Sequence, residues 1–314
     1  MKRVLMCVLL CAAPAMAQQV NDPDFKFANP KPSFAEGKGP VVCLDEAHNN
    51  YHTAEGRYKA FADVVRGDGF VFRSNLEKFS AESLAKCTVV VIANPANDEN
   101  AIGKTWAYPH PPAFTREETD AMFQWIRGGG SLLLIADHAP YAGAAAGLAA
   151  MLGAVMADGY ASIPREGQLP DIFSVQNQLL KPHAILRGRD GSDAVETVGT
   201  FTGSAFQVSA EFTSILVLPP GSTVLVRWVM NFGEAAPPQS EWPRIPVAGW
   251  SQGAARTLGK GRVMILGEAG MCSAQLAGPT KWQMGMNNPQ APKNAQFCLN
   301  TVRWLAGILP VAKE

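Results

Sequence analysis

Carboxylate and imidazole side chains follow three separate apolar runs of the sequence, at 40–45, 132–136 and 262–266. The polar residues that end or follow these runs are Asp45, Glu46, His48, Asn49, His52, Asp137, His138 and Glu268. Carboxylates and imidazoles carry general acid–base chemistry and hold divalent metal ions. Ligands bind beyond the carboxyl ends of the strands in open parallel α/β sheets, so these side chains are expected to share one sheet edge.

The pattern predicts a pocket with two alternative chemistries. The predicted catalytic residues are His48, Asp137, His138 and Glu268, and the predicted substrate-binding residues are Glu46, Asn49, His52 and Tyr141. In one alternative Asp45, His48 and His52 hold a divalent metal ion that activates water, with the two histidines four residues apart on one helical face. In the other, no metal is needed, and His48 or His138 is the general base, oriented by a carboxylate.

The order of apolar runs and helical patterns predicts the elements that position these residues. Strands are expected at 40–45, 70–72, 88–93, 132–136, 214–218, 223–229 and 262–266. Helices are expected at 54–65, 115–126, 141–156 and 292–305, and a short one is expected to start at residue 80. Thr115 and Glu118 form a capping-box pattern at the start of one helix. This alternation predicts an α/β fold with a doubly wound, mostly parallel sheet, formed by one domain over 39–310 with a β-rich insertion at about 158–260.

The composition excludes several classes of protein. The chain has 314 residues, 27 basic and 27 acidic side chains, and 47% hydrophobic residues, which is typical of a globular fold. Zero formal net charge gives no general attraction for nucleic acid or anionic membranes. GxGxxG, GxxxxGK[ST] and GxSxG are absent, so the sequence favours neither a nucleotide cofactor nor a serine nucleophile elbow.

The N-terminal segment has the pattern of an export signal. Lys2 and Arg3 precede an apolar run, and Ala15-Met16-Ala17 is a small-residue cleavage site, so we expect a signal peptide at 1–17, an extended lead-in at 18–38, and a periplasmic or secreted protein without stable membrane insertion. Four cysteines remain, and three pairings are possible. Cys43 and Cys87 are expected as free buried thiols, whereas Cys272 and Cys298 can either pair, which would pin the C-terminal loop, or stay free.

The segments 114–135, 148–153 and 261–268, with Asn294, Phe297, Asn300 and Trp304-Leu305, resemble the class I glutamine-amidotransferase-like fold, in particular the DUF4350 and GldG/IFT52-like group. The His-rich segment after the first strand is also similar to ThuA-like proteins, which are linked to sugar metabolism. Amidotransferases of this fold use a Cys–His–Glu triad. The loop at 93–97 has no cysteine, so the resemblance does not imply glutaminase activity.

Two functions follow as hypotheses. The first is an exported hydrolase that acts on a small-molecule, glycan or cell-envelope substrate at the predicted pocket. The second, which the non-enzymatic members of the resembled group suggest, is a non-catalytic periplasmic ligand-binding or assembly protein, in which Trp106, Tyr108 and Tyr141 form a sugar-stacking platform.

Overall fold

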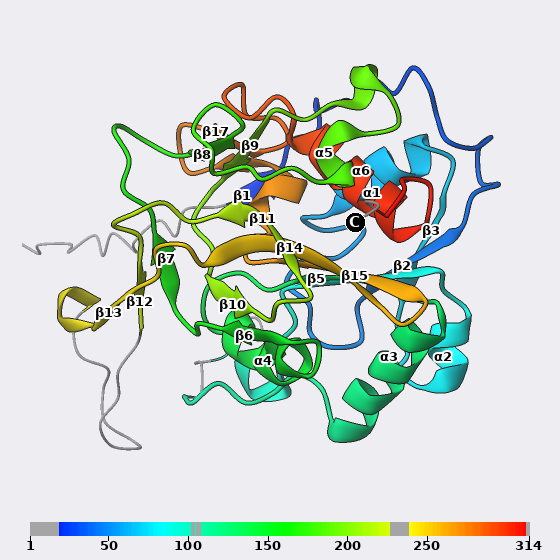
Figure 1. Cartoon of the computed structure of the whole chain (residues 1–314), viewed down its shortest axis with the longest axis horizontal. Coiled ribbons are helices and arrows are strands. Elements are labelled where there is room, and N and C mark those ends of the chain that lie inside the picture. The colour runs from blue at the N-terminus through cyan, green and yellow to red at the C-terminus, as the bar shows by residue number, and fades with distance from the viewer. Residues whose placement is uncertain (1–18, 102–103, 105–107, 227–238, 312–314) are drawn as a thin grey trace, which may run out of the picture.

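The computed structural model describes residues 19–101, 104, 108–226 and 239–311, and its centre is a nine-stranded sheet with helices on both faces (Figure 1). The strand order is β3-β2-β4-β5-β15-β14-β10-β6, and β11 also pairs with β14. The bounds are β2 Val41–Asp45, β3 Val71–Asn75, β4 Val89–Ala93, β5 Ser131–Ile135, β6 Ala154–Met156, β10 Phe206–Val208, β11 Thr213–Val217, β14 Ser251–Leu258 and β15 Gly261–Leu266. The predicted α/β class with a mostly parallel sheet is confirmed.

The parallel half of the sheet consists of β3, β2, β4, β5 and β15. All five residues of β4 and of β5 are buried, as expected for strands that helices cover on both sides. Parallel strands end at the same edge, so Asp45, Asn94, Asp137 and Glu268, at or after the ends of β2, β4, β5 and β15, come to one side of the molecule.

Two helical layers cover the sheet. The helices are α1 Lys59–Gly67, α2 Ala81–Ala85, α3 Arg116–Gly128, α4 Tyr141–Met151, α5 Ala184–Arg187 and α6 Asn294–Leu305. Buried side chains of α1, α5 and α6 share one core with one face of the sheet, and those of α2, α3 and α4 share a second core with the other face (Figure 1). The predicted capping box forms at the start of α3, between Thr115 and Glu118.

The segment 158–260 contributes strands to the main sheet as well as to smaller ones. The strands that it contributes to the smaller sheets are β7 Tyr160–Ser162, β8 Asp171–Ser174, β9 Thr197–Thr200, β12 Thr223–Leu225 and β13 Arg244–Pro246. A further small sheet, outside this segment, consists of β1 Gln19–Asn21, β16 Ala274–Ala277 and β17 Trp282–Gly285. β14, eight residues long, pairs antiparallel with β15 and is not predicted by its sequence. Part of the strand predicted at 223–229 lies outside the described residues.

The helix predicted at 141–156 ends earlier than expected. α4 stops at Met151, and Gly153 takes a φ of +94°, which glycine adopts without steric cost. The chain then turns into β6 instead of continuing the helix. The helix predicted from residue 54 begins at Lys59, because residues 54–57 form turns.

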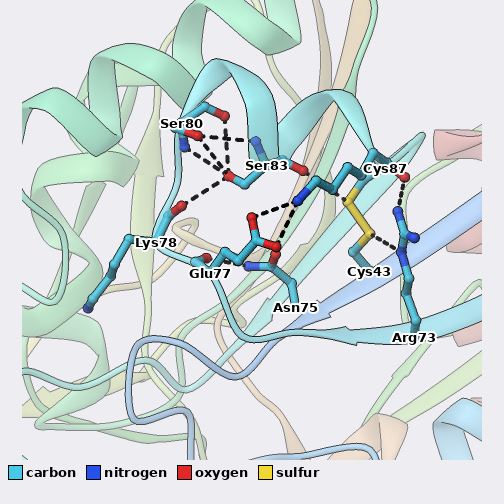
Figure 2. Close-up of a disulfide and its surroundings, with 9 residues drawn as sticks. Cys43, Arg73, Asn75, Glu77, Lys78, Ser80, Ser83 and Cys87 are labelled. Carbon is cyan, nitrogen blue, oxygen red and sulfur yellow. Dashed lines mark hydrogen bonds and ion pairs between the residues drawn. A yellow bond between two sulfur atoms is a disulfide. The ribbon is translucent and has the colours of Figure 1, made fainter.

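Two disulfides are present. Cys43 in β2 is bonded to Cys87, just after α2, and Cys272 is bonded to Cys298 in α6. The expectation that Cys43 and Cys87 are free thiols is therefore wrong. β2 and β4 are neighbours in the sheet, which brings Cys87, two residues before β4, close to Cys43, with 5.9 Å between the two Cα atoms. Figure 2 shows this bond beside Arg73, which donates to the Cys43 sulfur.

A buried ion cluster joins the N-terminal lead-in to the last helix. Arg303 of α6 is fully buried and donates to both carboxylate oxygens of Asp68, at 2.8 and 2.6 Å, and to Asp193 at 3.0 Å. Asn29 and the Ser33 backbone also donate to Asp68. These bonds satisfy the buried charges, and they tie residues 29–33 to the domain.

No helix in the described part of the chain combines the length and apolar character that a bilayer crossing requires. The predicted signal peptide at 1–17 lies outside the described residues. Both disulfides are of the kind that persists in oxidising compartments.

Candidate functional site

Two groups of polar residues lie at the carboxyl edge of the sheet. The first, which we call the anchoring cluster, comprises Asp45, His48 and Glu118. The second, which we call the edge site, comprises Tyr51, His52, Arg57, Tyr58, Asp137, His138, Tyr141, Tyr160 and Glu268. The predicted pocket is therefore divided, because His48 belongs to one group while Asp137, His138 and Glu268 belong to the other.

The anchoring cluster uses both nitrogens of His48. Nδ1 lies 2.8 Å from Asp45 Oδ2, and Nε2 lies 2.8 Å from Glu118 Oε1. Asn50 donates to the same oxygen of Asp45 at 2.6 Å. Both ring nitrogens can donate at once only in the imidazolium form. His48 is completely buried, so no ring nitrogen is left to act on a substrate.

Glu118 connects this cluster to the start of α3. Its Oε2 accepts the Thr115 N–H of the capping box, and its Oε1 accepts the Phe79 N–H as well as the bond from His48. Burial alone would raise the pKa of Glu118, but the bonds from Thr115, His48 and Phe79 together lower it. The His48 ring also contacts the rings of Phe79 and Phe114, each with 4.7 Å between centroids.

The predicted metal ligands do not come together. Residues 46–53 are irregular and 54–58 form turns, so His48 and His52 do not share a helical face as predicted. His52 instead packs against the ring of Tyr58, with 4.5 Å between centroids. Within the ranges that the structure describes, no group of three or more His, Cys, Asp or Glu side chains is placed to hold a metal ion.

Two of the predicted substrate-binding residues have structural contacts. Glu46 Oε1 accepts the Ala54 N–H at 2.8 Å and the Ser74 hydroxyl at 2.7 Å, which fixes the loop after β2 against the end of β3. Asn49 donates to Asp98 at 2.8 Å. Asn49 and Glu118 also line a cavity of about 560 Å³ beside α3.

Asn94 occupies the turn after β4. Its φ is +57°, a left-handed conformation in which asparagine is enriched among non-glycine residues. A nucleophile elbow would place a serine or cysteine at a strained turn of this kind after a strand. Here the Asn94 side chain instead accepts the Asp137 N–H at 2.9 Å, and its carbonyl accepts the Tyr51 N–H at 2.9 Å. Asn94 thus fixes two segments of the edge site.

Two carboxyl groups of the edge site lie close together. Glu268 is buried, and its two oxygens accept the N–H groups of Gly270 at 2.6 Å and Met271 at 2.8 Å. Burial, and next the charge of Asp137, raise the pKa of Glu268 well above its usual range. Asp137 is half-buried and accepts the His138 N–H at 2.7 Å. One carboxyl is therefore disposed to stay protonated beside one that reaches solvent.

His138 has one ring nitrogen without a hydrogen-bond partner among the described residues. Its Nδ1 lies 2.7 Å from the Ala139 carbonyl oxygen, to which only an N–H can donate, so the neutral ring carries its lone pair on Nε2. The ring stacks on Tyr160, with 4.5 Å between centroids, and is half-buried. Its geometry is that of an oriented general base.

The other aromatic residues surround this histidine. Tyr141 contacts the rings of Tyr51 and His138, and burial, followed by the nearby Tyr51 and Asp137, raises its pKa. Tyr58 is buried and donates to the Ala269 carbonyl at 3.0 Å, and its pKa is raised by burial, then by Glu268 and Asp137. Both phenols thus stay protonated as hydrogen-bond donors.

The sequence does not predict Glu118 as a partner of His48. Nor does it predict four members of the edge site, Tyr51, Arg57, Tyr58 and Tyr160. Glu118 lies 70 residues from His48 and was already explained by its capping box. Arg57 and Tyr58 follow the His-rich segment closely, but a helical pattern was assigned to them. Tyr160 lies in a segment that shows no clear periodicity.

Comparisons with known proteins agree with the fold. No family model and no curated protein matches the sequence. The N-terminal domain of mmIFT52 matches with 13% identity, covers 84% of this chain and 97% of that one, and has a TM-score of 0.57. The cytoplasmic protein STM3548 from Salmonella typhimurium has 12% identity, covers 85% and 98%, and has a TM-score of 0.48.

A ThuA-like protein from Bacteroides uniformis has 13% identity, covers 89% of this chain and 94% of that one, and has a TM-score of 0.45. At these identities the similarity shows a fold and no activity. The chain therefore has the class I glutamine-amidotransferase-like fold that it shares with the IFT52 N-terminal domain.

Proposed function

We propose that this protein is an exported hydrolase that acts on a glycan or cell-envelope substrate at the edge site, without a metal ion. The observation that carries the proposal is the orientation of His138: its Nδ1 faces the Ala139 carbonyl, and its Nε2 has no hydrogen-bond partner among the described residues. A neutral imidazole held in one tautomer is a suitable general base for the activation of water.

The proposed reaction moves one proton through His138. Nε2 takes a proton from water as the water oxygen attacks the substrate, and the Asp137 carboxylate stabilises the imidazolium that forms. The imidazolium then returns the proton to the leaving group. Glu268 is a positioning residue, because its buried carboxyl lies beside Asp137 and holds the backbone at 270–271.

The aromatic residues support a glycan as the substrate. Tyr51 and Tyr160 are half-buried, and their rings lie beside Tyr141 and His138 respectively. Partly exposed aromatic rings with polar ends are suited to stacking against sugars while they donate hydrogen bonds. The expected platform of Trp106, Tyr108 and Tyr141 receives no such support, because Tyr108 contacts His110, at 5.3 Å, and Trp106 lies outside the described residues.

A screen with the mature protein tests the proposal. Release of nitrophenol from 4-nitrophenyl glycosides and 4-nitrophenyl acetate, and solubilisation of peptidoglycan sacculi, are measured with and without EDTA. We expect turnover of at least one substrate that EDTA does not reduce, and its loss in Asp137→Asn. Asp63→Asn, on the exposed side of α1, is the control that keeps turnover. Loss of turnover after chelation would instead favour the metal-dependent alternative.

The second candidate is a non-catalytic ligand-binding or assembly protein. Asn94 favours it, because an asparagine stands at the left-handed turn where this kind of fold can present a nucleophile. In this case the mature protein binds a glycan of the panel at the edge site, and no substrate is turned over by the wild-type protein.

A further inference from the structure

In the described part of the chain, Arg57 lacks the carboxylate or carbonyl partners that the other buried and partly buried arginines have. Arg66, Arg189 and Arg303 bind carboxylates, and Arg256 and Arg262 donate to backbone carbonyls. Within the described ranges, Arg57 has no carboxylate at ion-pair distance, and its Nε is buried without a hydrogen-bond partner. Its guanidinium lies over the Tyr51 ring, 3.9 Å from the centroid.

His52 presents a second unpaired atom in the same place. The residue is 4% exposed, and its Nδ1 is buried without a partner. Burial, followed by the charges of Arg57 and His138, lowers the pKa of His52 to about 3, so the ring is neutral. A neutral imidazole can donate one hydrogen bond without adding a charge next to Arg57.

Leaving these groups unpaired costs free energy. A buried donor without a partner carries its full desolvation penalty, and the penalty is larger for a charged group. An anionic oxygen group placed against both donors relieves it, because the guanidinium fork matches carboxylate and phosphate oxygens. The Tyr51 ring lies against the face of the guanidinium, so the hydrogen bonds of the proposed group would be made in the guanidinium plane.

We infer that Arg57 and His52 form a subsite for an anionic oxygen group on the substrate, so that the preferred glycan is acidic. This inference rests on the proposed use of the edge site for a glycan. The group is a carboxylate, as in a uronic acid, or a phosphate ester, and both present the oxygen atoms that these donors require.

Binding measurements separate the inference from turnover. Calorimetric or NMR titrations compare D-glucuronate, D-glucose 6-phosphate and D-glucose with the wild-type protein and with Arg57→Gln, Arg57→Lys and His52→Phe. We expect at least one acidic sugar to bind wild type about tenfold or more tightly than glucose, the size of one charge-assisted hydrogen bond. Arg57→Gln removes this preference, His52→Phe reduces it, and Arg57→Lys retains part of it. Whichever acidic sugar binds more tightly identifies the carboxylate or the phosphate.

Arg66→Gln is the matched control, because Arg66 is a surface arginine of α1 that pairs with Asp63. It keeps the preference. Equal affinity of the wild-type protein for glucose and both acidic sugars overturns the inference, and so does an unchanged preference in a folded Arg57→Gln. Turnover of the screened substrates is measured separately, so the proposed hydrolase and the acidic subsite can fail independently.

Discussion

The anchoring cluster and the edge site lie at the same edge of the sheet but use their polar atoms differently. In the anchoring cluster every ring nitrogen of His48 and both oxygens of Glu118 are occupied by protein partners. In the edge site, as far as the chain is described, Nε2 of His138 has no hydrogen-bond partner, and Nδ1 of His52 and Nε of Arg57 are buried without partners. Polar groups whose hydrogen bonds are all made within the protein hold the structure together, whereas polar groups that lack partners can bind a ligand.

The comparison predicts the largest stability loss in the anchoring cluster. His48→Ala leaves two buried carboxylates, those of Asp45 and Glu118, without their bonds to the ring and removes the ring's contacts with Phe79 and Phe114, which we expect to cost about 3–5 kcal/mol. Chemical denaturation should show this loss, whereas His138→Ala, which removes one hydrogen bond and the stacking on Tyr160, should lose only about 1–2 kcal/mol. Similar losses at the two histidines would contradict the division of roles.

Each disulfide should contribute nearly as much to the free energy of unfolding as His48 does. Removal of the Cys43–Cys87 bond by a double Cys→Ser change opens a 44-residue separation, and removal of Cys272–Cys298 opens one of 26 residues. Chain entropy predicts a loss of about 3–4 kcal/mol for each, slightly larger for the first. The measurement is the free energy of unfolding of each double variant. An unchanged free energy would show that the bond does not form in the folded protein.

His52 should make stability depend on pH. Its pKa is about 3 in the folded protein and 6.5 when unfolded, so between these values only the unfolded state binds the proton. Stability is therefore complete above pH 6.5 and falls by up to about 1.4 kcal/mol per unit as the pH drops towards 3. Between pH 6.5 and pH 5, the free energy of unfolding should fall by about 2 kcal/mol less in His52→Phe than in the wild-type protein.

Burial also lowers the pKa of His183 to about 4. The resulting loss of stability at low pH is the same in wild type and in His52→Phe, so it cancels when the two are compared. Parallel stability curves for wild type and His52→Phe would mean that His52 is not buried in its neutral form.

Asn94 holds two segments of the edge site, and its replacement should have the smallest effect on stability. Asn94→Gly accepts the φ of +57° but loses the bond to the Asp137 N–H. We expect a change of about 1 kcal/mol or less in unfolding free energy, together with a severalfold loss of turnover because Asp137 is less well held. Unchanged turnover would show that Asp137 does not depend on Asn94.

The fold was predictable from the sequence because β2, β4, β5 and β15 are short apolar runs separated by helical patterns, which fixes a parallel sheet. β14 was not predicted, because its sequence, Ser-Gln-Gly-Ala-Ala-Arg-Thr-Leu, has neither an apolar run nor strict alternation. It is a strand because it pairs with β15 on one side and with β10 and β11 on the other.

The site was predictable in part. Asp137, His138, Tyr141 and Glu268 come together as strand order requires, but the partner of His48 could not be found, since Glu118 comes from a helix far along the chain. Which nitrogen of each histidine is occupied depends on tertiary contacts. The division between a structural histidine and an available one is therefore invisible to spacing alone.

Turnover by His138→Gln tests the central claim most directly. Glutamine keeps a polar side chain of similar reach but cannot act as a base at Nε2. On a substrate that the wild-type protein hydrolyses in the presence of EDTA, we predict that kcat falls by about 10²–10⁴-fold while the unfolding free energy is unchanged. Equal turnover by a folded His138→Gln would contradict the account and remove the edge site as the place of catalysis.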